Sequence, residues 1–502
     1  MKKKSILFAI FIGSFITCTP EFDRPVNSGS YHAGEADFTS YVAIGNSLTA
    51  GYMDGTVFRS GQMYSFPNIL AKQFAIVGGG EFTQPSYLDD VNNIGGLVLG
   101  GTQIGDTRLF INASIGGPQN FKGVPTIEVS ALQKKAYHNM GVPGSRTFHL
   151  LLSGYGDLTG VSGGTANPYF VRQATSSSTT VMNDALSLKP TFFTNWIGNN
   201  DVLGYATSGG VDDTLGTGEN QITPLNTFEV SYSTIVETLM TTAKGGVVAT
   251  IPNVTAIPFF TTVPFNPLTV STLGGDATVQ ALNASLYGPL SMIVSDRFKP
   301  LSSTGDNPLV ITDETLTDMS AQISAALQSS GVPAGQANDI GNIFGKARQA
   351  TSADLILLTT KNAIGAPSGS PAPFDKLGVT YPLQDEHVLI PSEQQLVKTA
   401  TDEFNTVIRT IAGKYNLALV DMNAIMNQLA GEGLKTEDGQ IYTNHYFSTD
   451  KLNTTLFSLD GVHPNARGYA LIANEIIKQI NIHYKAHLPI VNASGYPGAT
   501  IR

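Results

Sequence analysis

The segment Tyr41–Tyr52, which reads YVAIGNSLTAGY, constrains the fold more than any other part of the sequence. Its first residues are mostly apolar and run into Gly45, and small and polar residues follow. This pattern predicts a buried strand that ends in a tight turn and leads into a helix. Ser47 would then lie at the carboxyl edge of a sheet, where α/β proteins place their ligands. A serine there is either a helix N-cap or a nucleophile, and this segment alone favours the cap.

Strand and helix patterns along the rest of the chain predict an α/β protein. Runs of apolar, aromatic or β-branched residues indicate four further strands, at 136–140, 191–197, 247–251 and 417–421. Apolar residues at helical spacing indicate helices at 228–242, 392–415 and 470–480. The order strand, helix, strand favours parallel pairing with crossover helices. We therefore expect a mainly parallel, five-stranded sheet.

Two residues near the end of the chain supply the partners that a nucleophilic serine needs. Asp460 and His463 lie on a loop bounded by Gly461 and Pro464, just before the last predicted helix. A carboxylate can fix the tautomer of an imidazole and stabilise the imidazolium, while the other ring nitrogen faces a serine. Alone, the pair is equally well interpreted as a capping Asp and a surface His. Beside Ser47 it completes a nucleophile, a base and an orienting acid, which reverses the preference at Ser47.

Two further positions offer hydrogen-bond donors for the oxyanion that such a reaction forms. Donors that are already in place before the reaction stabilise this charge best. Gly144 follows the predicted strand at 136–140 and offers a backbone N–H. Asn200 follows the strand at 191–197 and offers a side-chain amide.

These four blocks, in this order, resemble the SGNH (GDSL-type) esterase/lipase family, a set of serine hydrolases on a three-layer α/β/α, flavodoxin-like fold. Ser47 matches the family nucleophile, and Asp460 and His463 match its paired acid and base. Gly144 and Asn200 match the oxyanion glycine and asparagine. The resemblance implies catalytic roles for Ser47, Asp460 and His463, and an oxyanion hole made by Ser47, Gly144 and Asn200. It also implies chemistry that requires no metal and no organic cofactor.

One position of the first block departs from the family pattern. Asn46 stands where the family usually has Asp. Asn keeps nearly the same shape but removes one negative charge beside the nucleophile, so the family resemblance does not fix the local hydrogen bonding or the pH dependence.

The N-terminus carries the pattern of an export signal. Lys2, Lys3 and Lys4 precede an apolar run at 6–16 that is too short to cross a bilayer as a helix. The only cysteine, Cys18, follows directly. A signal that ends in a lone Cys resembles a bacterial lipoprotein signal, in which that Cys is lipidated. The alternative is an ordinary signal peptide with a leftover thiol.

The resulting domain organisation has a signal, a tether, one catalytic domain and a tail. We expect a lipoprotein signal peptide at 1–18 with Cys18 as the lipidation site, and a Pro-, Gly- and Ser-rich tether at 19–37. The SGNH hydrolase domain is expected at 38–485, with a C-terminal tail at 486–502. Large insertions are expected at about 53–131, 202–227 and 258–391.

The function that we predict is an exported serine ester hydrolase of the carboxylesterase, lipase or acetylesterase type. Its substrate would be a small-molecule, glycan or lipid ester, and a lipid anchor would hold it at the bacterial outer membrane or cell surface. One alternative is a non-catalytic surface lipoprotein that binds glycan or lipid on the same fold, and another is an acyltransferase that uses the same residues. The net charge of −10 and the lack of a basic stripe beyond the N-terminus argue against nucleic acid as a partner.

Overall fold

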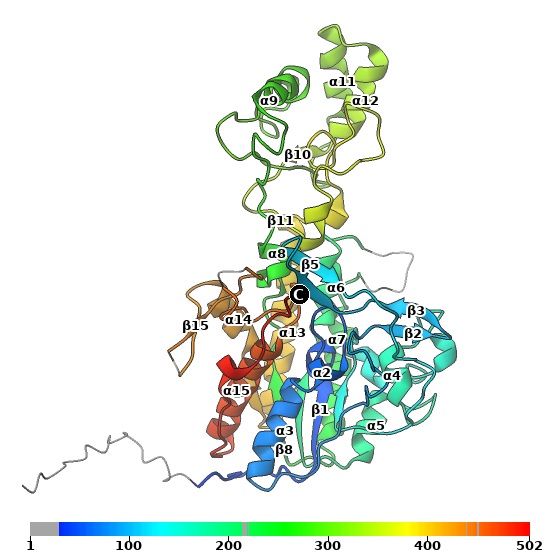
Figure 1. Cartoon of the computed structure of the whole chain (residues 1–502), viewed down its shortest axis with the longest axis vertical. Coiled ribbons are helices and arrows are strands. Elements are labelled where there is room, and N and C mark those ends of the chain that lie inside the picture. Colours follow the sequence, from blue (N-terminus) through cyan, green and yellow to red (C-terminus); the bar gives the residue numbers. More distant parts are fainter. Residues whose placement is uncertain (1–29, 213–217, 219, 438, 449–450) are drawn as a thin grey trace, which may run out of the picture.

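The centre of the protein is a sheet of five parallel strands, described here from a computed structural model that covers residues 30–212, 218, 220–437, 439–448 and 451–502 (Figure 1). The strand order is β13 (Ala418–Val420), β8 (Gly245–Ala249), β7 (Phe192–Trp196), β1 (Tyr41–Gly45), β6 (Asn139–Gly141). Every neighbouring pair in this sheet is parallel. In chain order the sheet reads 2-1-3-4-5, which is the flavodoxin-like order. The α/β fold class predicted from the sequence is confirmed.

Helices cover both faces of the sheet because parallel strands need crossover connections, and these are right-handed. Phe192 on β7 contacts Phe74 of α3 (Phe66–Ile76) and Tyr484, which directly follows α15 (Ala466–His483). Because successive residues of a strand point to opposite faces, the sheet has a second face that also needs a cover. That face is covered by α7 (Leu225–Leu239) and α13 (Pro391–Lys414), whose Phe228 and Phe404 stack with ring centroids 4.0 Å apart. The result is a three-layer α/β/α arrangement.

Helix α3 lies in the region 53–131, which the sequence analysis treats as an insertion. Its start has clear signals, since Ser65 accepts a hydrogen bond from the N–H of Asn68 and Pro67 occupies the first turn. Phe66, Ile69, Leu70 and Phe74 are buried on it, and it contacts α15. This part of the region therefore belongs to the central three-layer fold, as the crossover between β1 and β6.

Shorter elements complete the sheet domain. The helices are α1 (Ser47–Ala50), α2 (Arg59–Gln62), α4 (Pro168–Gln173), α5 (Val181–Ser187), α6 (Asn200–Thr207) and α14 (Met422–Ala430). Small antiparallel pairs are β2 (Leu97–Leu99) with β3 (Thr102–Gly105), β4 (Leu109–Asn112) with β5 (Gly117–Asn120), and β14 (Leu434–Lys435) with β15 (Ile441–Tyr442). Single helical turns are η1 (Phe148–Leu151), η2 (Leu158–Gly160), η3 (Val254–Ala256) and η7 (Ala493–Gly495).

The segment 258–391 rises above the sheet in Figure 1 and has a hydrophobic cluster of its own, with Val310, Ile311 and Phe344 fully buried at its centre. Its helices are α8 (Pro258–Thr261), α9 (Asp276–Leu282), η4 (Asn283–Tyr287), α10 (Gly288–Ile293), α11 (Ser320–Ser329), α12 (Ala334–Phe344), η5 (Leu358–Asn362) and η6 (Asp385–His387). Its strands pair as β9 (Val310–Thr312) with β10 (Ala347–Gln349), and β11 (Leu355–Ile356) with β12 (Val388–Leu389).

Both ends of the described chain pack on the sheet domain. His32 pairs with His487 in a short antiparallel bridge, and Ile501 pairs with Ile111. Cys18, the expected signal and most of the expected tether lie outside the described residues. Within the part of the chain that the structure describes, no helix has the length and apolar character needed to cross a membrane.

Candidate active site

Ser47 occupies the first position of α1, just after the carboxyl end of strand β1. The helix cap is the neighbouring residue, because the Asn46 side-chain oxygen accepts the N–H of Leu48 at 3.1 Å. The Ser47 hydroxyl is therefore free for another partner. Gly141 on β6 allows this arrangement, since a Cβ there would collide with the backbone of α1 at Ala50.

The partner of the Ser47 hydroxyl is His463. The distance from His463 Nε2 to Ser47 Oγ is 2.8 Å, and that from His463 Nδ1 to Asp460 Oδ2 is 3.0 Å. The two ring nitrogens thus face a hydroxyl and a carboxylate at the same time. The structure thus brings Ser47 together with Asp460 and His463, which lie more than 400 positions further along the sequence.

The Asp460 carboxylate accepts hydrogen bonds from several directions. Its Oδ1 receives the Ser458 hydroxyl and the backbone N–H groups of Val462 and His463, each at 2.9 Å. Its Oδ2 receives the N–H of Gly55 at 3.1 Å in addition to the imidazole. Burial alone would raise the pKa of Asp460, but His463 and the hydrogen bonds outweigh it and lower the pKa below the usual value. Asp460 is therefore held as a carboxylate.

A loop after α1 supports this carboxylate, and the sequence analysis did not identify it. Asp54 accepts the N–H of Leu459 at 3.0 Å, and its own N–H donates to the Ser458 hydroxyl at 3.0 Å. Burial raises the pKa of the Asp54 carboxyl to about 7. Tyr52 packs its ring on the imidazole of His463, with centroids 4.5 Å apart. Tyr52 and Asp54 lie close to Ser47 in the sequence, and this closeness is the only sequence feature that could have identified them.

The two predicted oxyanion residues lie on adjoining loops. The Asn200 side-chain amide donates to the backbone carbonyl of Ser145, the residue after Gly144, at 2.9 Å. Next to Asn200, the buried Asp201 accepts the N–H and the hydroxyl of Thr147 at 3.0 and 2.8 Å. These bonds fix the two loops to each other. Gly144 has φ = +79°, a left-handed conformation that glycine adopts without strain.

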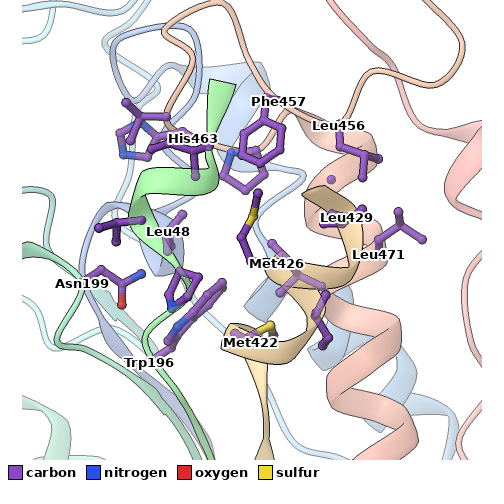
Figure 2. Close-up of a pocket in the computed structure, with 18 of the residues that line it drawn as sticks. Leu48, Trp196, Asn199, Met422, Met426, Leu429, Leu456, Phe457, His463 and Leu471 are labelled. Atoms are coloured by element: carbon purple, nitrogen blue, oxygen red, sulfur yellow. The ribbon is translucent and has the colours of Figure 1, made fainter. Parts of the chain in front are cut away.

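A pocket adjoins Ser47, and Asn200 and His463 also line it. Figure 2 shows His463 towards one end of this pocket and Trp196 and Met422 towards the other. Gly144 is not among the residues that line it. Among the described residues, no group of three or more His, Cys, Asp or Glu side chains is arranged to hold a metal ion.

A comparison with protein-family models identifies the family that part of the chain matches. Residues 321–476 match the family model described as GDSL-like lipase/acylhydrolase. The chain contains a GDSL-like hydrolase domain. The family resemblance is therefore confirmed, and so is the prediction that the chain is a serine hydrolase acting on ester bonds. The match includes α13, β13 and the loop with Asp460 and His463, whereas Ser47, Gly144 and Asn200 precede it.

Solved structures similar to this chain include an alpha/beta hydrolase and an acetylxylan esterase. One is LAE5, described as an alpha/beta hydrolase from the metagenome of Lake Arreo, with 11% identity over 90% of this chain and 98% of that chain, at a TM-score of 0.31. Another is Axe2, an acetylxylan esterase from Geobacillus stearothermophilus, with 11% identity over 90% and 98% of the two chains, at a TM-score of 0.32. A search of curated protein sequences finds no match.

Proposed function

We propose that this GDSL-like hydrolase cleaves carboxylic esters with Ser47 as nucleophile, His463 as general base and Asp460 as the orienting carboxylate. The observation that carries this proposal is the continuous hydrogen-bonded chain from Asp460 Oδ2 through both nitrogens of His463 to Ser47 Oγ, with distances of 3.0 and 2.8 Å. A serine becomes a good nucleophile only beside such an oriented base.

The reaction follows from this geometry. As Ser47 Oγ attacks the ester carbonyl, His463 Nε2 takes its proton, and Asp460 stabilises the imidazolium that forms. The imidazolium then protonates the departing alkoxide and leaves an acyl group on Ser47. Water attacks this acyl group with His463 again as base, which releases the carboxylic acid and restores the hydroxyl. None of these steps uses a cofactor.

The oxyanion of each tetrahedral intermediate would be held by the N–H groups of Ser47 and Gly144 and by the Asn200 amide. No described residue accepts a hydrogen bond from either N–H group. The Asn200 amide has two N–H bonds, of which Ser145 engages one, so the second can donate to the oxyanion. Donors that are held in place before the reaction are the most effective.

We also propose that the enzyme is exported and anchored by a lipid at Cys18. The signal-like N-terminus is the support for this proposal. The first described residues join the sheet at the amino end of β1, whereas Ser47 lies at its carboxyl end. Ser47 thus lies at the end of the sheet opposite to the end at which the described chain begins. The test is detergent-phase partitioning of the full chain, which the variant Cys18→Ala should abolish and an ordinary secreted protein would not show.

The catalytic proposal is tested by Ser47→Ala with p-nitrophenyl butyrate as substrate. Loss of the nucleophile should lower kcat by on the order of 10⁴ or more. The control is Ser329→Ala, which changes an exposed serine on α11 of the insertion. Full activity in Ser47→Ala contradicts the proposal. Addition of an alcohol acceptor separates hydrolysis from acyl transfer, because an acyltransferase would form the new ester in place of the free acid.

A further inference from the structure

The pocket next to Ser47 has apolar walls almost throughout. Apart from Glu475, its polar residues are those gathered around the nucleophile, namely Asn46, Ser47, Asn199, Asn200 and His463. The remaining walls come mainly from α14, from α15 and the loop before it, and from the ends of β7 and β8.

Side chains from these elements meet in the depth of the pocket. Met422 and Met426 on α14 point into it opposite Leu471 of α15 and Trp196 of β7 (Figure 2). All four residues are buried, with 4–5% of each exposed. These four side chains offer none of the carbonyl, carboxylate or amide groups that a sugar ring needs to replace its hydrogen bonds with water, and Glu475 is the one carboxylate of the lining. The pocket is therefore suited to hydrocarbon.

The size of the pocket sets the length of chain that it holds. Its cavity volume is about 110 Å³. An apolar cavity of about 150 Å³ holds a benzene ring, which has six carbon atoms. A chain of about four to six carbons therefore fills the space beside Ser47, and an acetyl group leaves most of it empty.

We propose that this pocket binds the aliphatic chain of the acyl group, so that the enzyme acts on medium-chain acyl esters in preference to acetyl esters. The proposal rests on the roles proposed for Ser47 and His463. The acyl group remains on Ser47 through both chemical steps, whereas the alcohol has to leave and be replaced by water. Dry, apolar walls suit the group that stays, because they offer no partner to the incoming water.

The first test is hydrolysis of p-nitrophenyl esters from acetate to decanoate by the full chain. Each buried methylene should raise kcat/KM by about fourfold until the pocket is filled at about six carbons. Two isomers, ethyl hexanoate and hexyl acetate, decide which side of the ester is bound. Ethyl hexanoate should react at least tenfold faster. Equal rates for acetyl and hexanoyl esters, or faster reaction of hexyl acetate, overturn the acyl pocket and leave the hydrolase function intact.

The second test uses a variant that fills the pocket. Met426→Phe should lower the ratio of hexanoate to acetate hydrolysis by about tenfold or more, since one added ring occupies the space of the chain. The matched control is Met292→Phe, because Met292 lies on α10 of the insertion and is 81% exposed. An unchanged ratio in Met426→Phe overturns the proposal.

The third test measures binding without catalysis. Trp196 is the only tryptophan of the chain and lines the pocket, so its fluorescence reports on a bromine atom that comes into contact with it. In Ser47→Ala, 6-bromohexanoate should quench this fluorescence in a saturable manner, and bromoacetate at the same concentrations should not. Equal quenching by both overturns the pocket assignment. This readout is independent of the catalytic proposal, which fails separately if the wild type hydrolyses no ester.

Discussion

The substitution Asp460→Asn tests how the carboxylate controls the tautomer of His463. Asp460 offers two acceptor oxygens, and five donors use them. Asparagine has only one acceptor oxygen. Placed at the Oδ1 position, that oxygen keeps the three donors there, and the amide nitrogen then faces the N–H of Gly55 and His463 Nδ1. The new side chain therefore donates to His463 where the carboxylate accepted from it.

Two consequences follow from this reversal. His463 has to accept at Nδ1, so its proton moves to Nε2, which points at Ser47 Oγ and can no longer take the hydroxyl proton. In serine proteases, replacing the triad aspartate by asparagine produces this wrong tautomer and lowers kcat by about 10⁴. We expect a fall of similar size here. The Gly55 N–H loses its acceptor, which costs about 1–3 kcal/mol of stability.

The assay is kcat for p-nitrophenyl butyrate together with the free energy of unfolding in urea. Asp276→Asn is the control, because it makes the same chemical change at an exposed position on α9. A fall in kcat of less than tenfold in folded Asp460→Asn would refute the assigned role of the carboxylate.

Two further predictions concern the surroundings of the site. Burial raises the pKa of Asp54 from 3.8 to about 7, so the folded state binds more protons than the unfolded state between these values, and the contribution of Asp54 to stability falls as the pH rises from about 4 to about 7. The variant Asp54→Asn should therefore make the free energy of unfolding less dependent on pH, by up to about 1.4 kcal/mol per pH unit. Urea unfolding between pH 5 and 7 measures this dependence, and the same slope in the variant and the wild type would contradict the prediction. Asn200→Ala should lower kcat by about 10²–10³ with little change in KM, and activity equal to the wild type would remove Asn200 from the oxyanion hole.

The sheet was largely predictable because its strands carry local signals. Tyr41–Gly45 and Phe192–Trp196 are buried along their whole length, and a strand buried on both faces reads as a continuous apolar run. Helix α3 was missed because it stands among glycine-rich loops, although Ser65 and Pro67 mark its start. The separate core of 263–390 forms from short elements far apart in the sequence, and such packing leaves no periodic pattern.

The predicted site residues were found by the chemistry that they can share, and not by position. Ser47 and His463 are recognisable because a nucleophile needs a base. The support from Asp54 was not predictable, since it depends on contacts with Ser458 and Leu459, which lie about 400 positions away in the sequence. Asn46 proved to be the cap of α1, a role that Asp would fill equally well. The apolar pocket was not predictable either. It depends on Met426 of α14, and nothing in the sequence around Met426 indicates that this side chain lines a pocket.

The central claim, that Ser47 is the activated nucleophile, is tested most directly by covalent labelling. The wild type is treated with a fluorophosphonate, and the modified residue is found by peptide mass spectrometry. We predict one adduct on Ser47, its absence in Ser47→Ala, and much slower labelling in His463→Ala, because the base 2.8 Å away activates the hydroxyl. No adduct on the folded wild type, or an adduct on another serine with Ser47 unmodified, would contradict the claim.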